Sequence, residues 1–210
     1  MFAADFIHSM KHKILEKAGE MFINYGFKSI TMDDIAKQMG ISKKTIYAHF
    51  KNKTKLIEQA TLVIFELISS GIDCICEMQK NPIEELYAIK SFVMENLKNE
   101  KSSPQFQLQK YYPEIFHKLK LMQLEVMQKC IIKNLERGIE EKLYRNEIDL
   151  NFISRIYFNG IVGIKDEETF PLDIFSPNYL LESYLEYHIR AVATNKGLLK
   201  LEKLLSKNEK

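Results

Sequence analysis

Apolar residues near the start of the chain recur with the spacing of one face of an α-helix. Between residues 14 and 25 they stand at i, i+4, i+7, i+8 and i+11, and the pattern ends at Gly26. Further helical patterns cover residues 52–79, 81–99, 114–143, 149–164, 178–193 and 195–205. No segment keeps the apolar-polar alternation of a strand. The sequence therefore predicts an all-α protein of nine or ten helices.

Two short helices are predicted at residues 31–39 and 43–50. Thr31 begins a capping box with Asp34, and Gly40 suits the left-handed position after a helix end. Ser42 then caps the second helix. Two short helices joined by a glycine-containing turn are typical of the helix-turn-helix motif, which we place at residues 31–50.

The second of these helices has a distinct outward face. At 100° per residue, Ile46 and Phe50 lie 40° apart and face the preceding helices, while Lys44 and Ala48 point away. The outward and flanking residues are Lys43, Lys44, Thr45, Tyr47 and Ala48. Lysine can reach guanine acceptors or phosphate, and an alanine methyl can contact thymine. This pattern indicates DNA recognition; a solvated lysine face is the simpler alternative.

The first sixty residues also resemble the TetR family of transcriptional regulators. The resemblance rests on Lys11–Leu15, Phe22, Gly26-Phe27, Thr31, Ile35-Ala36, Gly40-Ile41-Ser42, Thr45-Ile46-Tyr47, His49-Phe50, Lys53 and Leu56. It implies an N-terminal three-helix DNA-binding domain at 8–68. It also implies a larger helical domain at 69–210, which binds a small effector and forms a homodimer.

The same resemblance implies roles for individual residues. Positions that meet bases and nearby phosphates correspond to Lys43, Lys44, Thr45, Tyr47 and Ala48. Phosphate positions correspond to Thr31, His49 and Lys53. Lys55 departs from the family, which often has an acid there, and adds to the basic surface.

Charge is unevenly distributed over the 210 residues, whose formal net charge is only +2. Residues 1–61 hold ten lysines and six acids, a net charge of +4, and the remainder carries −2. A basic N-terminal part on a near-neutral body favours an anionic partner for that part. Three cysteines without a framework spacing, no visible secretory signal and no apolar run of about 18 residues predict a cytoplasmic protein that does not enter membranes.

Catalytic and metal chemistry find little support in the sequence. His8 and His12 have helical i, i+4 spacing but no third ligand nearby. Cys74 and Cys76 point about 200° apart on a helix, so they cannot hold one ion locally. Nucleophile-base arrangements and glycine-rich phosphate loops are not visible. We expect neither an enzyme nor a bound metal or cofactor.

Two features of the second domain suggest binding surfaces. The aromatic residues Tyr87, Phe92, Phe106, Tyr111, Tyr112 and Phe116 could line a pocket for a flat apolar or aromatic effector, although ordinary core is the simpler interpretation of each residue taken separately. Gly160 and Gly163 lie three residues apart on a helix and predict close helix packing. That packing could be at the dimer interface or within one subunit.

These observations predict a homodimeric transcriptional regulator, a repressor released from a near-palindromic operator by a small molecule. The alternative is a ligand-independent architectural DNA-binding protein. The sequence leaves the operator, the target genes and the effector open.

Overall fold

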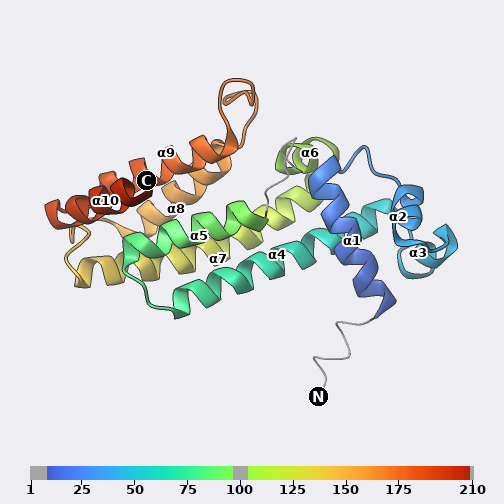
Figure 1. The fold of residues 1–210 in the computed structure, drawn as a ribbon, viewed down its shortest axis with the longest axis horizontal. Helices are drawn as coiled ribbons and strands as arrows, with labels where there is room; N and C mark the ends of the chain where they lie inside the picture. Colours follow the sequence, from blue (N-terminus) through green and yellow to red (C-terminus); the bar gives the residue numbers. More distant parts are fainter. Residues whose placement is uncertain (1–8, 97–103, 209–210) are drawn as a thin grey trace, which may run out of the picture. The chain divides into compact units, whose positions relative to one another are not determined.

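The structure is a computed structural model that describes residues 9–96 and 104–208 (Figure 1). Regular secondary structure in these residues is α-helical, and one isolated antiparallel bridge joins Tyr144 and Ala193. In chain order the helices are α1 (Met10–Tyr25), α2 (Met32–Met39), α3 (Lys43–His49), α4 (Lys53–Glu77), α5 (Pro82–Asn96), α6 (Pro104–Tyr111), α7 (Pro113–Glu140), α8 (Leu150–Gly163), α9 (Pro177–Val192) and α10 (Asn195–Asn208). The predicted all-α fold is confirmed.

Prolines mark helix starts in this chain. Four of the ten helices begin at a proline, where the missing N–H removes no helical hydrogen bond. Pro104 begins α6, a helix that lies between the predicted helical segments 81–99 and 114–143 and that the sequence patterns did not predict.

The helices group into two compact units. Among the described residues, the first comprises 9–68 and 104–121, and the second comprises 69–96 and 122–208. The compact units divide the chain differently from the expected domains at 8–68 and 69–210, because α6 and the start of α7 pack with the N-terminal helices; the functional domain boundary stays a prediction. Both α4 and α7 run through the two units.

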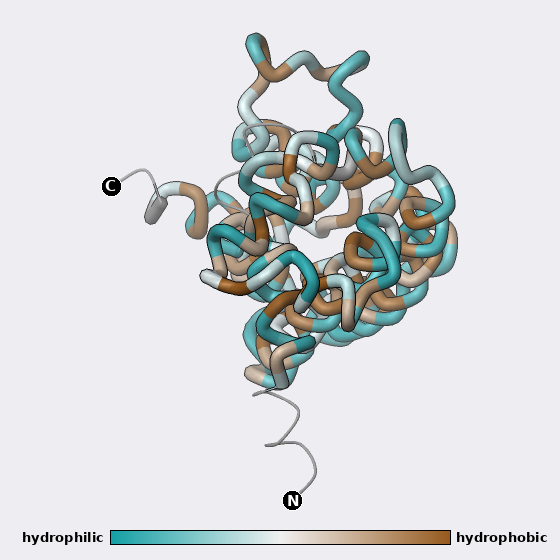
Figure 2. The backbone as a smooth tube through the Cα atoms, turned by 90° about the vertical axis from the view of Figure 1, so that its right-hand side faces the viewer, coloured by the Kyte–Doolittle hydropathy of each residue, from teal (hydrophilic) through white to brown (hydrophobic). Residues whose placement is uncertain are grey.

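The first unit is held together by an apolar core shared among its helices. Ile14 and Phe22 of α1, Ile35 of α2, Ile46 of α3 and Leu56 of α4 are completely buried. Leu108 of α6 joins the same core, which is why this later segment belongs with the N-terminal helices. Figure 2 shows apolar and polar stretches alternating along the helices, the pattern of amphipathic elements with one buried side.

The second unit contains a buried polar network beside its apolar core. Glu85 of α5 is 2% exposed, and its Oε2 lies 2.9 Å from Nη1 of Arg137 on α7. Asn134 donates to Glu85 Oε1 at 2.8 Å and to the Pro82 carbonyl at 2.9 Å. The Tyr144 hydroxyl donates to the side-chain Oδ1 of Asn134 at 3.3 Å. A buried charge is tolerated only with such partners, so the network fixes α5 against α7.

Helix α4 corrects one sequence expectation. It is long and apolar enough, by length and composition alone, to cross a membrane, whereas the sequence patterns predicted no such segment. Buried core helices of soluble proteins can pass the same test, but 11% of this apolar stretch is buried. Its first turns carry Leu56, Ile57 and Ala60, which are completely buried in the core of the first unit. We therefore interpret α4 as a helix that serves both units.

His188 of α9 is buried without a hydrogen-bond partner for Nε2 among the described residues. Its ring centroid lies 4.5 Å from that of Tyr157 on α8. Burial disfavours the charged imidazolium and lowers the pKa of His188 to about 4. His188 is therefore neutral in the folded protein at neutral pH.

This burial predicts acid sensitivity. Between the folded and the unfolded pKa, the unfolded chain binds a proton that the folded protein does not, so stability falls as pH is lowered. We expect His188 to reduce the free energy of unfolding by about 2 kcal/mol between pH 7 and pH 5. Urea denaturation at both pH values should show a smaller decrease for His188→Gln. His117→Gln, at an exposed position of α7, is the control and should behave like the wild type; equal decreases in all three proteins would contradict the assignment.

Candidate nucleic-acid interface

The turn between α2 and α3 depends on a glycine. Gly40 has φ 66° and ψ 28°, and its N–H donates to the Lys37 carbonyl at 3.2 Å. An added Cβ would meet nothing within 4 Å, so the glycine is needed for its backbone conformation rather than for space. Ser42 then accepts a hydrogen bond from the Thr45 N–H at 3.1 Å and begins α3.

Side chains of α3 divide into a buried side and an exposed side. Ile46 is 0% exposed and Phe50, which follows the helix, is 1% exposed. Tyr47 is 46% exposed, and the remaining exposed side chains are Lys43, Lys44, Ala48 and His49. Thr45 is half-buried, and its hydroxyl lies 2.8 Å from that of Ser42. The helix thus presents the lysines, a phenol and a methyl group together on its solvent side.

Lys43 and Lys44 differ in their local partners. Lys43 Nζ lies 2.6 Å from Asp33 Oδ2, so an ion pair connects α3 with α2. The hydrogen bond to Asp33 raises the pKa of Lys43. Lys44 makes no ion pair with the described residues. Its ammonium group is therefore available to an anionic partner, whereas that of Lys43 is shared with Asp33.

Two of the expected phosphate contacts are engaged within the protein. Thr31 and Asp34 form a complete capping box, in which the Thr31 hydroxyl also donates to Asp34 Oδ2 at 2.7 Å. These bonds lower the pKa of Asp34. Lys53 is half-buried, and its Nζ donates to the Lys28 carbonyl at 3.1 Å. Burial lowers the pKa of Lys53. Both residues stabilise the first unit, whatever else they contact.

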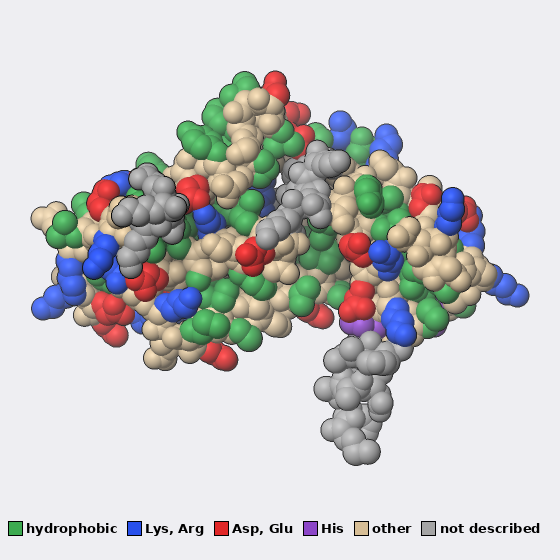
Figure 3. Space-filling model, in the orientation of Figure 1, with side chains coloured by type: hydrophobic (Ala, Val, Ile, Leu, Met, Phe, Trp, Pro, Cys, Tyr) green, Lys and Arg blue, Asp and Glu red, His purple; other side chains and the backbone are tan. Residues whose placement is uncertain are grey.

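Basic side chains are exposed around α2 and α3 (Figure 3). They include Lys37 of α2, Lys44 of α3 and Lys51 in the bend after α3. Lys55 is exposed too, but its Nζ lies 2.7 Å from Glu58 Oε2. The free positive charge at this surface thus comes from side chains next to the exposed face of α3.

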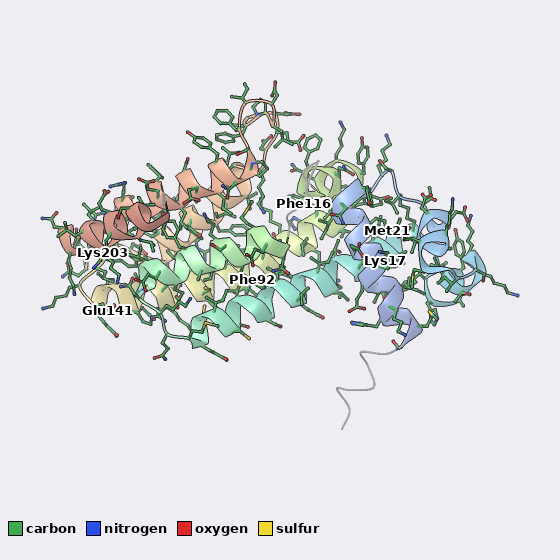
Figure 4. The ribbon with its side chains drawn as sticks, viewed as in Figure 1. Lys17, Met21, Phe92, Phe116, Glu141 and Lys203 are labelled. Atoms are coloured by element: carbon green, nitrogen blue, oxygen red, sulfur yellow. The ribbon has the colours of Figure 1, made fainter. Side chains whose placement is uncertain are left out.

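The six aromatic residues of the expected effector pocket are divided between the units. Tyr87 and Phe92 lie on α5 in the second unit, and the first unit contains Phe106, Tyr111, Tyr112 and Phe116. Figure 4 labels Phe92 and Phe116 on their separate helices. A cavity within either unit therefore cannot include all six.

Several of these rings have packing partners of their own. The Phe92 ring lies where a Cβ on Gly71 would stand, since that atom would be 2.0 Å from Cζ. Tyr112 and Phe116 pack against the core of the first unit. The Lys28 ammonium lies 4.8 Å from the centroid of the Tyr111 ring. Ordinary packing accounts for these residues, as the simpler interpretation of the sequence stated.

Tyr87 differs, because it combines burial with an unpartnered polar atom. Its side chain is 5% exposed, and its hydroxyl has no hydrogen-bond partner among the described residues. Burial raises the pKa of Tyr87 to about 12. His188 Nε2, on the neighbouring α9, has the same property. Sequence reasoning missed His188, because no local pattern distinguishes it from an exposed histidine.

Gly160 and Gly163 have different surroundings. A Cβ on Gly160 would lie 2.0 Å from Cζ of Tyr184, whose hydroxyl donates to the Ile156 and Tyr157 carbonyls at 3.0 and 3.1 Å. Close packing of α8 with α9 in one subunit thus explains Gly160. A Cβ on Gly163 would meet nothing within 4 Å.

Residues 9–96 and 104–208 contain no group of three or more His, Cys, Asp or Glu side chains that could hold an ion. His12 lies in this part of the chain, with Nε2 at 3.3 Å from Glu16 Oε1, and His8 lies outside it.

Comparison with known proteins finds similarity to bacterial transcriptional regulators. The sequence profile described as "Bacterial regulatory proteins, tetR family" matches residues 14–60. The biofilm operon icaADBC HTH-type negative transcriptional regulator IcaR of Staphylococcus aureus (strain Newman) is 33% identical over 78 residues, which are 37% of this chain and 42% of IcaR. The HTH-type transcriptional repressor KstR2 of Mycolicibacterium smegmatis is 23% identical over 154 residues, 70% of this chain and 73% of KstR2. This chain thus spans less than half the length of IcaR.

Solved structures with low sequence identity share the fold. A TetR-family transcriptional regulator from Agrobacterium tumefaciens has a TM-score of 0.70 at 16% identity, covering 88% of this chain and 97% of its own. SmeT, the repressor of the Stenotrophomonas maltophilia multidrug efflux pump SmeDEF, has a TM-score of 0.67 at 15% identity, covering 90% and 92%. Residues 14–60 thus match the DNA-binding domain profile of the tetR family, and the chain shares its fold with solved structures described as TetR-family regulators.

Proposed function

We propose that the protein is a homodimeric, sequence-specific transcriptional repressor that a small molecule releases from its operator. The observation that carries this proposal is the exposed face of α3, with Lys44 and Tyr47 beside the capped N-terminal turn. Recognition helices of helix-turn-helix proteins present their N-terminal residues to base edges in the major groove. The relatives described as repressors support the same function. In this role the protein acts with DNA in the cytoplasm and carries no catalytic activity.

Residues of the interface take different roles in this proposal. Lys44 and Tyr47 contact base edges, and Ala48 faces a thymine methyl. Lys43 and Thr45 meet bases or nearby phosphates from the sides of α3, and His49 meets a phosphate. Thr31 and Lys53 contact phosphates at the start of their helices while keeping their internal hydrogen bonds.

The apolar surface of α8 and α9 supports the homodimer. Phe152 and Ile156 of α8 are 59% and 46% exposed, and Gly163 lies farther along the same helix. Tyr179 and Tyr187 of α9 are also exposed. Large exposed apolar side chains concentrated on two packed helices are typical of a protein interface. Pairing of this surface with a second copy would give two recognition helices, and hence a near-palindromic operator with half-sites ~34–36 Å apart or somewhat farther.

The second unit is where we place the effector. Tyr87 and His188 come from two packed helices, α5 and α9, and each has a buried polar atom without a partner. Such atoms are normally satisfied by water or a ligand. A flat apolar molecule with one or two polar groups would suit these partners and the nearby Tyr157 ring.

We first predict the effect of substitutions on α3. Gel shifts should show that the wild type prefers DNA from its own upstream region over bulk DNA, which an architectural protein would not. Lys44→Ala and Tyr47→Ala should each weaken specific binding by ~1–3 kcal/mol, because a base contact is lost, and relax the preference at one base pair. Lys53→Ala should instead weaken binding to all sequences and reduce the salt slope by about one.

Lys129→Ala on α7 is the matched control, since it removes one exposed lysine of the second unit. Its affinity and salt slope should equal those of the wild type. Circular dichroism of every variant should retain the helical signal. Wild-type affinity in both Lys44→Ala and Tyr47→Ala would place DNA recognition elsewhere.

A second prediction concerns the dimer. Ile156→Glu places a charge on the proposed α8–α9 interface, where burial of an unpaired carboxylate is costly. Light scattering should show a shift from dimer toward the 24.7 kDa monomer. Leu199→Glu changes a 74% exposed leucine on α10 in the same way and should leave the dimer intact. Dimeric Ile156→Glu protein with unchanged operator affinity would show that this surface is not the interface.

A third prediction concerns the effector. A library of planar apolar compounds should contain one that raises the thermal midpoint of the protein, because ligands of the native state stabilise it. That compound should weaken operator binding, and operator DNA should weaken its binding by the same factor. Tyr87→Phe removes only the hydroxyl and should lower affinity for the compound without changing DNA affinity. Equal affinity in Tyr87→Phe and wild type would exclude this hydroxyl from the site.

A further inference from the structure

Two cysteines far apart in the sequence meet in the second unit. Cys76 near the end of α4 and Cys130 on α7 have their Sγ atoms 3.6 Å apart. Both side chains are half-buried, and both thiols are free. The third cysteine, Cys74, is exposed and lies two residues before Cys76, about 200° away around α4. The chain therefore contains one thiol pair and one separate thiol.

The distance between the two sulfur atoms allows a covalent bond after a small movement. A disulfide requires about 2.05 Å between sulfurs, so the atoms need to approach by about 1.5 Å. Side-chain rotation can supply most of this movement, because each residue has a single χ1 angle. The pair is already in hydrogen-bond contact, and no other side chain has to leave from between them.

The two thiols have different electronic environments. The hydrogen bond with Cys130 holds the pKa of Cys76 below its ordinary value, although burial and the charges of Glu85 and Asp73 oppose this effect. The same hydrogen bond raises the pKa of Cys130. The thiolate is the reactive form of cysteine, so the lower pKa favours Cys76 as the attacking sulfur and Cys130 as the resolving thiol.

We propose that Cys76 and Cys130 form a dithiol site that a hydroperoxide oxidises to an intrachain disulfide. The inference is independent of DNA binding. In the first step the Cys76 thiolate attacks the hydroperoxide, its S–O bond forms as the O–O bond breaks, and the alcohol or water leaves with a proton. In the second step Cys130 attacks the sulfenic sulfur, the S–S bond forms, and the hydroxyl leaves with the Cys130 proton as water. Two thiols are oxidised and one hydroperoxide is reduced.

A soft metal ion held between the two thiolates is the main competing chemistry. Two sulfurs alone can hold such an ion, but the described residues contain no group of three metal ligands. The disulfide needs no further ligand, so the geometry favours it. The experiment distinguishes the two.

The test uses the reduced full-length protein and hydrogen peroxide. Titration of free thiols in the denatured protein should fall from three to one, and dithiothreitol should restore all three. The intact mass should fall by two hydrogens, and peptide mapping should join Cys76 to Cys130. A non-reducing gel should still show a single chain, since the bond lies within the chain.

Three variants sharpen the result. Cys74→Ser is the matched control and should still form the cross-link, with its thiols falling from two to none. Cys130→Ser should form no cross-link and should leave a sulfenic acid on Cys76 that dimedone traps.

Retained thiols in both wild type and Cys74→Ser, or a cross-link through Cys74 between chains, would overturn the proposal. So would protection of the pair by one bound Cu(I) ion together with resistance of the metal-free protein to peroxide. Cys76→Ser should likewise form no cross-link; failure of either pair variant to fold does not affect the comparison between wild type and Cys74→Ser.

Discussion

Ile46 and Phe50 occupy one side of the α3 segment and are buried in the core that α1, α2 and α4 share. Removing such a side chain typically costs 2–5 kcal/mol, a large part of a domain's stability. The helix is therefore unable to rotate about its axis without exposing this apolar side. Because the inner side is fixed, the outer side is fixed as well, and it carries Lys44, Tyr47 and Ala48.

Polar residues around α3 differ in whether they have partners within the first unit. Lys43 forms an ion pair with Asp33, the Thr31 hydroxyl donates to Asp34, and Lys53 Nζ donates to the Lys28 carbonyl. The Lys43–Asp33 ion pair connects α3 with α2, and the Lys53 hydrogen bond connects the start of α4 with Lys28. Lys44 makes no ion pair with the described residues, which is why the proposed function assigns it a base contact together with the exposed Tyr47.

Buried polar groups give the second unit two contrasting sites. Glu85 is paired with Arg137 and Asn134, so its charge is compensated and the network holds helices together. Tyr87 and His188 are buried with polar atoms that lack partners. The first arrangement is complete without a ligand, whereas the second gains hydrogen bonds from one. This contrast is the physical basis for placing an effector beside α5 and α9.

The sequence by itself determined the features that depend on local spacing. Helical periodicity gave the all-α class, the capping box at Thr31 gave the start of α2, and Gly40 gave its end, because each requires only residues a few positions apart. Tertiary structure alone decided the rest. It attached α6 to the first unit, separated Phe92 from Phe116, and explained Gly160 by Tyr184. It also brought Cys76 to Cys130 across 54 residues. Such contacts depend on how helices pack, and packing is set by the summed burial of many side chains rather than by any local pattern.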